Sequence, residues 1–260
     1  MIHIEQFIFN PFQENCFLVW DNDGHCAVVD PGYTDAEKKD IVAFIEAKNL
    51  KPVCILLTHA HFDHIYGVAD FARTYNVPVY MSAKEAYTLK VTNPHICGMY
   101  GLDLPDLPYC SQGDVIRHGE ERSKILRHGE ERSEILRHGE ERSDVAISFI
   151  DIHDGDTIPV GNLRFTVLET PGHSVGGVCY LEQNEGVLFT GDTIFAGAIG
   201  RTDHPGGDYD LMMKGIWEKI MCLDGETAIY PGHGPSSDVA RERMTNPFLL
   251  PFNLPNDDEE

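Results

Sequence analysis

The chain has 260 residues, 42% apolar and 24% charged, enough to bury a core of ordinary size in one large domain or two small ones. Its formal net charge is −22, and no lysine–arginine cluster stands apart from acidic residues, which argues against nucleic acid or an anionic membrane surface as a partner. No apolar stretch reaches the ~18 residues of a membrane span and no signal peptide is recognised, so a cytoplasmic location is expected. The seven cysteines form no CxxC pair, which favours reduced thiols over disulfides or zinc–thiolate binding.

In chain order, the first half alternates strand-like and helix-like segments. Runs rich in β-branched and aromatic residues predict strands at 16–20, 26–30, 53–59 and 77–82. Residues 34–50 carry apolar side chains at helical spacing behind Thr34, which is the expected N-cap. Residues 63–75 repeat this pattern and predict a second helix.

The second half repeats the alternation of strands and helices. Strands are predicted at 164–169, 177–182, 186–192 and 227–233. The segment 208–220 has the spacing of a helix and lies before the last of these strands. Alternation in both halves predicts an α/β layered architecture in which helices cover the faces of sheets.

The segment THAHFDH, residues 58–64, packs three histidines and an aspartate behind a predicted buried strand. If the strand continues in extended form, its period of two places His59 and His61 on one side, where they can share a metal ion. Asp63 and His64 begin the next helix, where the chain changes direction, so their side chains can reach a second metal position. The alternative is that these histidines are merely hydrogen-bonded at a strand end.

Three further candidate ligands follow predicted strands within glycine-containing turns. His173 lies in LETPGHS, Asp192 in LFTGD and His233 in IYPGHG. Glycine lets the backbone approach other groups closely, and loops at strand ends often carry functional side chains. Singly each motif is weak, but together they repeat one arrangement of strand, glycine turn and potential ligand.

This series of motifs resembles the metallo-β-lactamase superfamily, whose pattern is H-x-H-x-D-H followed by a downstream His, Asp and His. The resemblance begins at VVDPG, residues 28–32, and ends at PGHG, so it covers nearly the whole chain. It implies a four-layer αβ/βα sandwich, an α/β fold of two mixed sheets flanked by helices. The metals would lie in a cleft at one edge of the two packed sheets.

The resemblance also implies a ligand set. By this match, the first metal would be held by His59, His61 and His173. The second would be held by Asp63, His64 and His233. Asp192 would bridge the two metals, and Asp30 would support the site without binding metal.

The number of candidate ligands independently favours two metals. Five histidines and two aspartates exceed what one tetrahedral zinc ion takes, because it binds four ligands including an open position for water. Two divalent ions, expected to be zinc with iron or manganese as alternatives, can share a carboxylate and a hydroxide. The hydroxide would attack a substrate carbonyl while Asp63 orients it. A thiolate is a suitable leaving group because zinc is borderline-soft.

Within the superfamily, the sequence resembles small bacterial hydrolases akin to glyoxalase II. The segments that carry this resemblance are 191–216, PGHG and MTNPFL at 244–249. The resemblance implies a small-molecule substrate, a hydroxyacyl thioester of glutathione. Arg201 either contacts an anionic substrate or forms an ion pair with an acidic neighbour. His153 and His204 belong to no ligand motif and are natural control positions.

Other functions stay open at this point. A persulfide dioxygenase would use a single iron ion bound by His59, His173 and Asp192, a two-histidine, one-carboxylate set. Lactone or phosphodiester hydrolysis by the same metals is a further alternative, because fold and metal set do not determine the substrate. A non-catalytic metal-binding scaffold is disfavoured because all seven candidate ligands are present.

A tandem repeat interrupts the chain between the two halves. Three decapeptides that begin RHGEERS occupy 117–126, 127–136 and 137–146. The motifs on either side match the family without the repeat, so it is interpreted as a surface insertion in a single domain that spans 1–260 and ends in an acidic tail at 254–260. The alternative is that its histidines or its Ile-Leu pairs form a binding surface.

Overall fold

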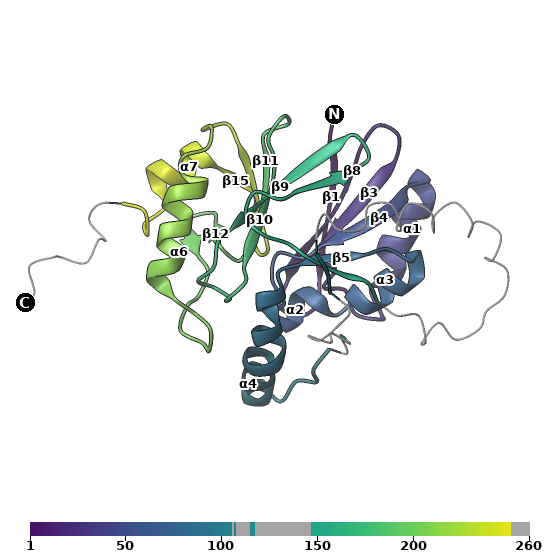
Figure 1. Cartoon of the computed structure of the whole chain (residues 1–260), viewed down its shortest axis with the longest axis horizontal. Helices are drawn as coiled ribbons and strands as arrows, with labels where there is room; N and C mark the ends of the chain where they lie inside the picture. The colour runs from purple at the N-terminus through teal and green to yellow at the C-terminus, as the bar shows by residue number, and fades with distance from the viewer. Residues whose placement is uncertain (106, 108–114, 118–146, 251–260) are drawn as a thin grey trace, which may run out of the picture.

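Two mixed β-sheets pack face to face, with helices on both outer surfaces (Figure 1). The computed structural model describes residues 1–105, 107, 115–117 and 147–250. The repeat beyond Arg117 and the acidic tail lie outside the described residues, so the predictions for them stay predictions. Among the described residues, every helix is too short or too polar to cross a lipid bilayer.

The first sheet has the strand order β1-β2-β3-β4-β5-β7-β6 and the second β15-β14-β11-β10-β9-β8. The strands of the first sheet are β1 (His3–Phe9), β2 (Glu14–Trp20), β3 (His25–Val29), β4 (Lys51–Leu56), β5 (Val79–Met81), β6 (Val115–Arg117) and β7 (Phe149–Asp151). Those of the second are β8 (Thr157–Val160), β9 (Leu163–Glu169), β10 (Val178–Glu182), β11 (Val187–Gly191), β14 (Ala228–Pro231) and β15 (Ser237–Asp238). A small hairpin of two strands stands apart, β12 (Ile194–Phe195) and β13 (Ala198–Ile199).

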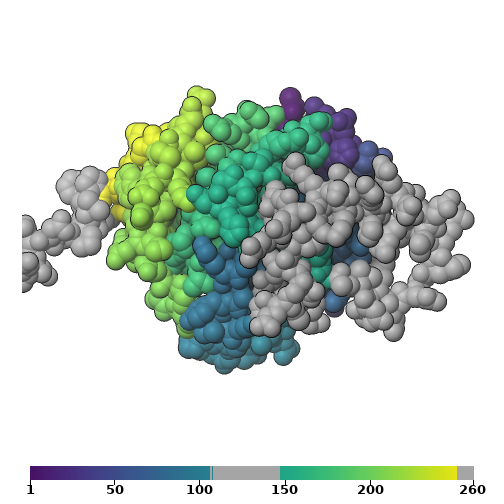
Figure 2. All heavy atoms as spheres, in the orientation of Figure 1, coloured from purple at the N-terminus to yellow at the C-terminus, as the bar shows by residue number. Residues whose placement is uncertain are grey.

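The helical segments of the described residues lie between these strands, except α7, which follows β15. They are α1 (Lys38–Lys48), α2 (Phe62–Ile65), α3 (Val68–Tyr75), the 3₁₀ turn η1 (Ala83–Glu85), the π-helical η2 (Thr88–Thr92), α4 (Asn93–Tyr100), α6 (Tyr209–Gly215), the π-helical η4 (Ile216–Ile220) and α7 (Val239–Thr245). Viewed as filled atoms, the segment that contains α4 forms the lower edge of the molecule, below the strands of the second sheet (Figure 2).

The central strands bury both faces, which explains their nearly continuous apolar sequences. In β2, Phe17 and Val19 join the core between the two sheets, whereas Leu18 joins the core under the helices. The second sheet divides its side chains in the same way. In β11, Phe189 faces the other sheet and Leu188 faces the outer helices.

Each outer face is covered by helices from its own half of the chain. Ile41 and Ile45 of α1 and Phe71 of α3 pack on the first sheet. Met212 of α6 and Ile216 of η4 pack on the second. The three resulting cores separate four layers, so the predicted αβ/βα sandwich is confirmed.

Two predictions about helices were wrong, namely where one helix begins and whether another is continuous. The helix predicted from residue 34 begins at Lys38, because the Thr34 hydroxyl donates to the Glu37 carboxylate instead of capping the first turn. The helix predicted over 63–75 is broken between α2 and α3 at Gly67. A Cβ at position 67 would lie 2.6 Å from the Tyr33 ring, so only glycine lets the backbone at this position pack against Tyr33.

Candidate metal centre

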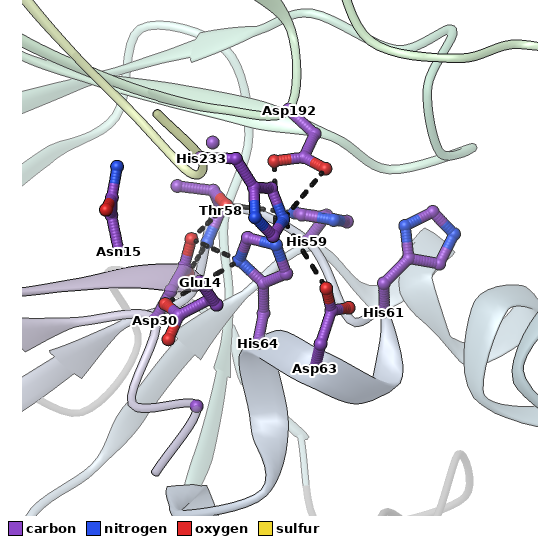
Figure 3. Close-up of polar contacts among 12 residues, drawn as sticks. Glu14, Asn15, Asp30, Thr58, His59, His61, Asp63, His64, Asp192 and His233 are labelled. Atoms are coloured by element: carbon purple, nitrogen blue, oxygen red, sulfur yellow. Dashed lines mark hydrogen bonds and ion pairs between the residues drawn. The ribbon is translucent and has the colours of Figure 1, made fainter. Parts of the chain in front are cut away.

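The first four candidate ligands come from the loop after β4 and the short helix α2. Strand β4 ends at Leu56, earlier than predicted, and the chain then carries His59 and His61 over the sheet edge. Helix α2 begins directly after His61, whose backbone is extended. Asp63 and His64 therefore leave the first turn of α2 toward the same space as His59 (Figure 3).

The other three ligands come from loops of the second sheet. His173 lies between β9 and β10, Asp192 follows β11 directly, and His233 follows β14 after Gly232. Strands β11 and β14 are parallel neighbours, so their carboxyl ends meet at one edge and bring Asp192 close to His233. Gly232 makes this approach possible, because a Cβ there would lie 2.3 Å from Oδ1 of Asp192.

The seven side chains converge from the two sheets, and all of them except His173 are labelled in Figure 3. Nδ1 of His61 lies 2.8 Å from Nε2 of His173. Nε2 of His233 lies 3.4 Å from Oδ2 of Asp63. The Asp192 carboxylate stands between both sets, 3.4 Å from Nε2 of His173, 3.5 Å from Nε2 of His64 and 3.6 Å from Nε2 of His233.

These donor atoms fit a pair of divalent metals. Ligands about 2.0–2.1 Å from a tetrahedral ion lie roughly 3.3 Å from one another, close to the separations around Asp192. Nε2 of His59, Nε2 of His64 and Oδ1 of Asp192 are buried without a hydrogen-bond partner among the described residues. An unsatisfied buried polar atom costs about 1–3 kcal/mol, a penalty that a bound metal would remove.

In four of the five candidate histidines, the ring nitrogen that faces away from this cluster is held by the surrounding protein. Nδ1 of His59 lies 3.0 Å from the Thr58 hydroxyl. Nδ1 of His173 donates to the carbonyl oxygen of Arg201, and Nδ1 of His233 to that of Phe12. Outer contacts of this kind are what orient the rings of metal-binding histidines.

Asp30 anchors the remaining ring, that of His64. Its carboxylate accepts from the Thr58 backbone N–H at 2.7 Å and lies 3.1 Å from Nδ1 of His64. Asp30 adopts a left-handed backbone conformation with φ of 47°, which few residues other than glycine, asparagine and aspartate tolerate. Asp30, which the family resemblance gave a supporting role, thus joins the loop of His59 to helix α2, which carries His64.

The metal-free site has an uneven charge distribution. Burial lowers the pKa values of His59 and His61, so both rings are neutral and available as ligands. Burial also lowers the pKa of His64, but the nearby Asp192, Asp63 and Asp30 carboxylates outweigh that effect and raise it well above its usual value. His64 is therefore the ring whose proton competes most strongly with a metal.

Two supporting residues escaped the sequence analysis, Glu14 and Asn15 at the start of β2. Asn15 donates to the carbonyl oxygens of Pro231 and Gly234, which fixes the turn that carries His233. Glu14 is fully buried beside His64, and burial raises the pKa of its carboxyl well above the usual value. The sequence signal that could have indicated them is a charged residue followed by an amide residue at the start of a strand that is otherwise apolar.

Glu85 is a third residue that the sequence did not indicate. It is fully buried in η1, and its two carboxylate oxygens accept from the backbone N–H groups of Ala60 and Gly176, each at 2.7 Å. Ala60 lies between His59 and His61, and Gly176 follows His173 in the next turn. Glu85 thus joins the two loops that carry the first metal's predicted ligands.

Arg201, His153 and His204, which are outside the predicted ligand set, differ in their contacts with the cluster. Arg201 forms a two-point ion pair with Asp203, at 2.9 and 3.1 Å, and both side chains are 69% exposed. Its proposed contact with substrate stays a prediction. His153 is exposed and lies away from the cluster, whereas the ring of His204 packs against His61 and His173. His204 is therefore unsuitable as a control.

Comparisons with known proteins agree with this architecture. Residues 9–233 match the metallo-beta-lactamase superfamily. The chain is 32% identical to the probable metallo-hydrolase YqgX of Bacillus subtilis, over 94% of this chain and 96% of that protein. It is 27% identical to the hydroxyacylglutathione hydrolase GloC of Haemophilus influenzae, over 95% and 98% of the two chains.

Two solved structures are also similar. The B3 metallo-beta-lactamase BLEG-1 has a TM-score of 0.73 at 30% identity, with 95% of this chain and 99% of that chain covered. TTHA1623, solved in a di-iron-bound form, has a TM-score of 0.70 at 28% identity, with 94% and 100% covered. The match over most of the chain, the shared fold and the converging histidines and aspartates lead to one conclusion: this chain is a metallo-hydrolase of the metallo-β-lactamase superfamily.

Proposed function

We propose that this protein is a dinuclear metal hydrolase of thioesters, of the hydroxyacyl-glutathione type. The observation that carries the proposal is the clustering of five histidines and two aspartates, with Asp192 within 3.6 Å of His64, His173 and His233 and with buried donor atoms that lack other partners among the described residues. Two divalent ions held by these residues would supply a hydroxide nucleophile at neutral pH and an electrophile for the substrate carbonyl. The full-length similarity to GloC favours a thioester.

The residues of the chain have separate roles in this proposal. His59, His61 and His173 would hold the first ion, Asp63, His64 and His233 would hold the second, and Asp192 would be shared by both. Asp63 would also be a catalytic residue, because its ionised carboxylate could accept a hydrogen bond from the hydroxide that the ions supply and orient it. Burial raises the pKa of Asp63, but His64 and His233 outweigh that effect and keep it below the usual value.

The surroundings of His233 suggest where the acyl group lies. The ring of Phe12 packs edge-to-face on that of Phe62, with centroids 4.9 Å apart, and is 38% exposed. The Phe12 backbone accepts the hydrogen bond from His233, and Phe62 lies between His61 and Asp63 in the sequence, so both rings belong to segments that carry or hold candidate ligands. An apolar wall next to a charged centre suits a carbonyl substrate with a short carbon chain.

A substrate panel together with metal analysis tests the proposal. Protein purified without added metal is expected to contain about two metal ions per chain and to hydrolyse a hydroxyacyl-glutathione thioester faster than lactones, phosphodiesters or β-lactams. The β-lactam is included because of the 30% identity to BLEG-1. A single iron ion with oxygen consumption on glutathione persulfide would replace the hydrolase by a dioxygenase, and full metal content without any turnover would favour a scaffold.

A further inference from the structure

The outer nitrogen of His61 differs from those of the other four histidines in the metal centre. The outer nitrogens of His59, His64, His173 and His233 each have a partner in the described structure. His61 turns Nδ1 toward His173, so its outer nitrogen is Nε2. That atom is buried and has no hydrogen-bond partner among the described residues. When a metal binds Nδ1, the ring's proton must sit on Nε2, and this buried N–H then requires an acceptor.

His204 is the neighbour that can provide an acceptor. Its ring lies edge-to-face with that of His61, with centroids 4.9 Å apart and planes at 90°. Nε2 of His204 is also buried and without a hydrogen-bond partner among the described residues. A hydrogen bond between these two ring nitrogens would be favourable, because it would remove the free-energy cost of leaving each of them buried without a partner.

The loop that carries His204 is fixed on both sides of it. The Arg201 carbonyl oxygen accepts from His173, which ties the start of the loop to the metal centre. The Pro205 carbonyl oxygen accepts from the Thr92 hydroxyl at 2.7 Å, which ties its end to η2. The His204 ring is therefore held against His61 by contacts that do not depend on its own nitrogens.

We propose that His204 is a positioning residue for His61: a ring nitrogen of His204 accepts the hydrogen bond of the His61 Nε2–H, directly or through one water. This inference rests on the proposed function, because it requires a metal on Nδ1 of His61. In the present orientation Nδ1 of His204 lies 3.5 Å from the Pro205 carbonyl oxygen, a long contact that a half-turn of the ring would give up. The contact selects the tautomer of His61 that presents Nδ1 to the metal.

Two substitutions distinguish the role of the His204 ring nitrogens from that of the packed ring. His204→Phe keeps a flat ring against His61 but removes both nitrogens, and is expected to weaken zinc binding about ten-fold or more. His204→Gln loses the ring but keeps an acceptor, and is expected to stay within about three-fold of the parent. His153→Phe is the matched control, since His153 is exposed and distant from the cluster, and it should bind zinc as the parent does.

The experiment measures zinc dissociation constants of the full chain by competition with a chelator. In parallel, nitrogen-15 NMR of the zinc-loaded protein follows solvent exchange of the His61 Nε2–H proton, which should be slow in the parent and His204→Gln and fast in His204→Phe. Zinc binding and proton exchange in His204→Phe equal to those of the parent would overturn the inference, as would equal losses in both variants. A parent that binds no zinc would overturn the proposed function as well.

Discussion

At the scale of single residues, Asp192 is the candidate ligand that lies close to members of both predicted metal-binding sets. Its carboxylate lies within 3.6 Å of nitrogens from His64, His173 and His233, and so touches both predicted ligand sets. Gly232 packs against its Oδ1 atom, so a side chain at position 232 would displace the carboxylate. Loss of this carboxylate should therefore affect both metals at once.

We expect Asp192→Ala to lower metal content from about two ions per chain toward one or none. The reason is that the remaining histidines lose the shared anionic ligand that balances two adjacent cations. Elemental analysis of protein purified without added metal measures this directly. His153→Ala is the control, and a loss of metal in that variant instead would mean that the site is assigned to the wrong residues.

Asp63→Asn tests the catalytic role of a ligand. The amide keeps the size of the side chain, which lies 3.4 Å from Nε2 of His233, but lacks the negative charge that would bind the metal and orient the hydroxide, so we expect turnover to fall by about 10²–10⁴-fold. Some metal and the fold should be retained, as shown by elemental analysis and circular dichroism. Turnover equal to that of the parent would exclude Asp63 from the chemical step.

The raised pKa of His64 predicts opposite pH dependences with and without metal. Without metal, protonated His64 pairs with Asp192 and Asp30, which contributes stability that is present below pH 6.5 and is lost as pH rises through the raised pKa. A metal needs the neutral ring, so apparent zinc affinity should rise with pH over the same range. Calorimetric titration should show proton release on zinc binding near neutral pH, and pH-independent binding without proton release would contradict this.

At the scale of elements, the site depends on how separate loops are tied together. The turn η1 contributes Glu85, whose two hydrogen bonds join the loop of His59 and His61 to the turn after His173. Strand β2 contributes Asn15, which holds the turn of His233. These links cross between the halves of the chain, so the distance between ligands depends on residues that bind no metal.

We predict that Glu85→Gln lowers the free energy of unfolding by about 1–3 kcal/mol, because one of two buried backbone N–H groups loses its acceptor. Zinc affinity should fall with it, since Ala60 and Gly176 are no longer held at a fixed separation. Chemical denaturation and zinc titration measure the two effects. Glu169→Gln is a matched control, because Glu169 forms an ion pair with the exposed Lys84, and such pairs contribute little.

At the scale of the whole molecule, the flanks of the tandem repeat lie side by side. Strand β6 ends at Arg117 and pairs in parallel with β7, with Ile116 opposite Ile150. A parallel pair needs a connection that returns along the strands, so a very short linker would strain both of them. The structure therefore sets a minimum length for any replacement of the repeat.

Replacing the repeat between Ile116 and Ile147 with a Gly/Ser linker of about ten residues is expected to leave the metal stoichiometry and kcat/KM within a few-fold of the parent. The reason is that the family match and the predicted ligands lie on either side of the insertion. Steady-state kinetics and elemental analysis of the shortened chain check this. A folded, metal-loaded chain without activity would mean that the repeat contributes to substrate binding.

The sequence by itself determined the layered α/β class and the identity of the candidate ligands. Strand periodicity and local motifs such as THAHFDH and PGHG carry that information, because both depend on residues close together in the chain. The break between α2 and α3 was not predictable, since it arises where Gly67 meets the ring of Tyr33.

The tertiary structure alone decided how the candidate ligands are held. Glu85 joins Ala60 to Gly176, and Asn15 fixes the turn of His233, although the partners are far apart in the sequence. His204 could not be separated from His153 by its motif, yet only His204 contacts the metal centre. The physical reason is that hydrogen bonds and ring contacts depend on distances of a few ångströms in space, which the packing of the two sheets sets and which local sequence patterns do not encode.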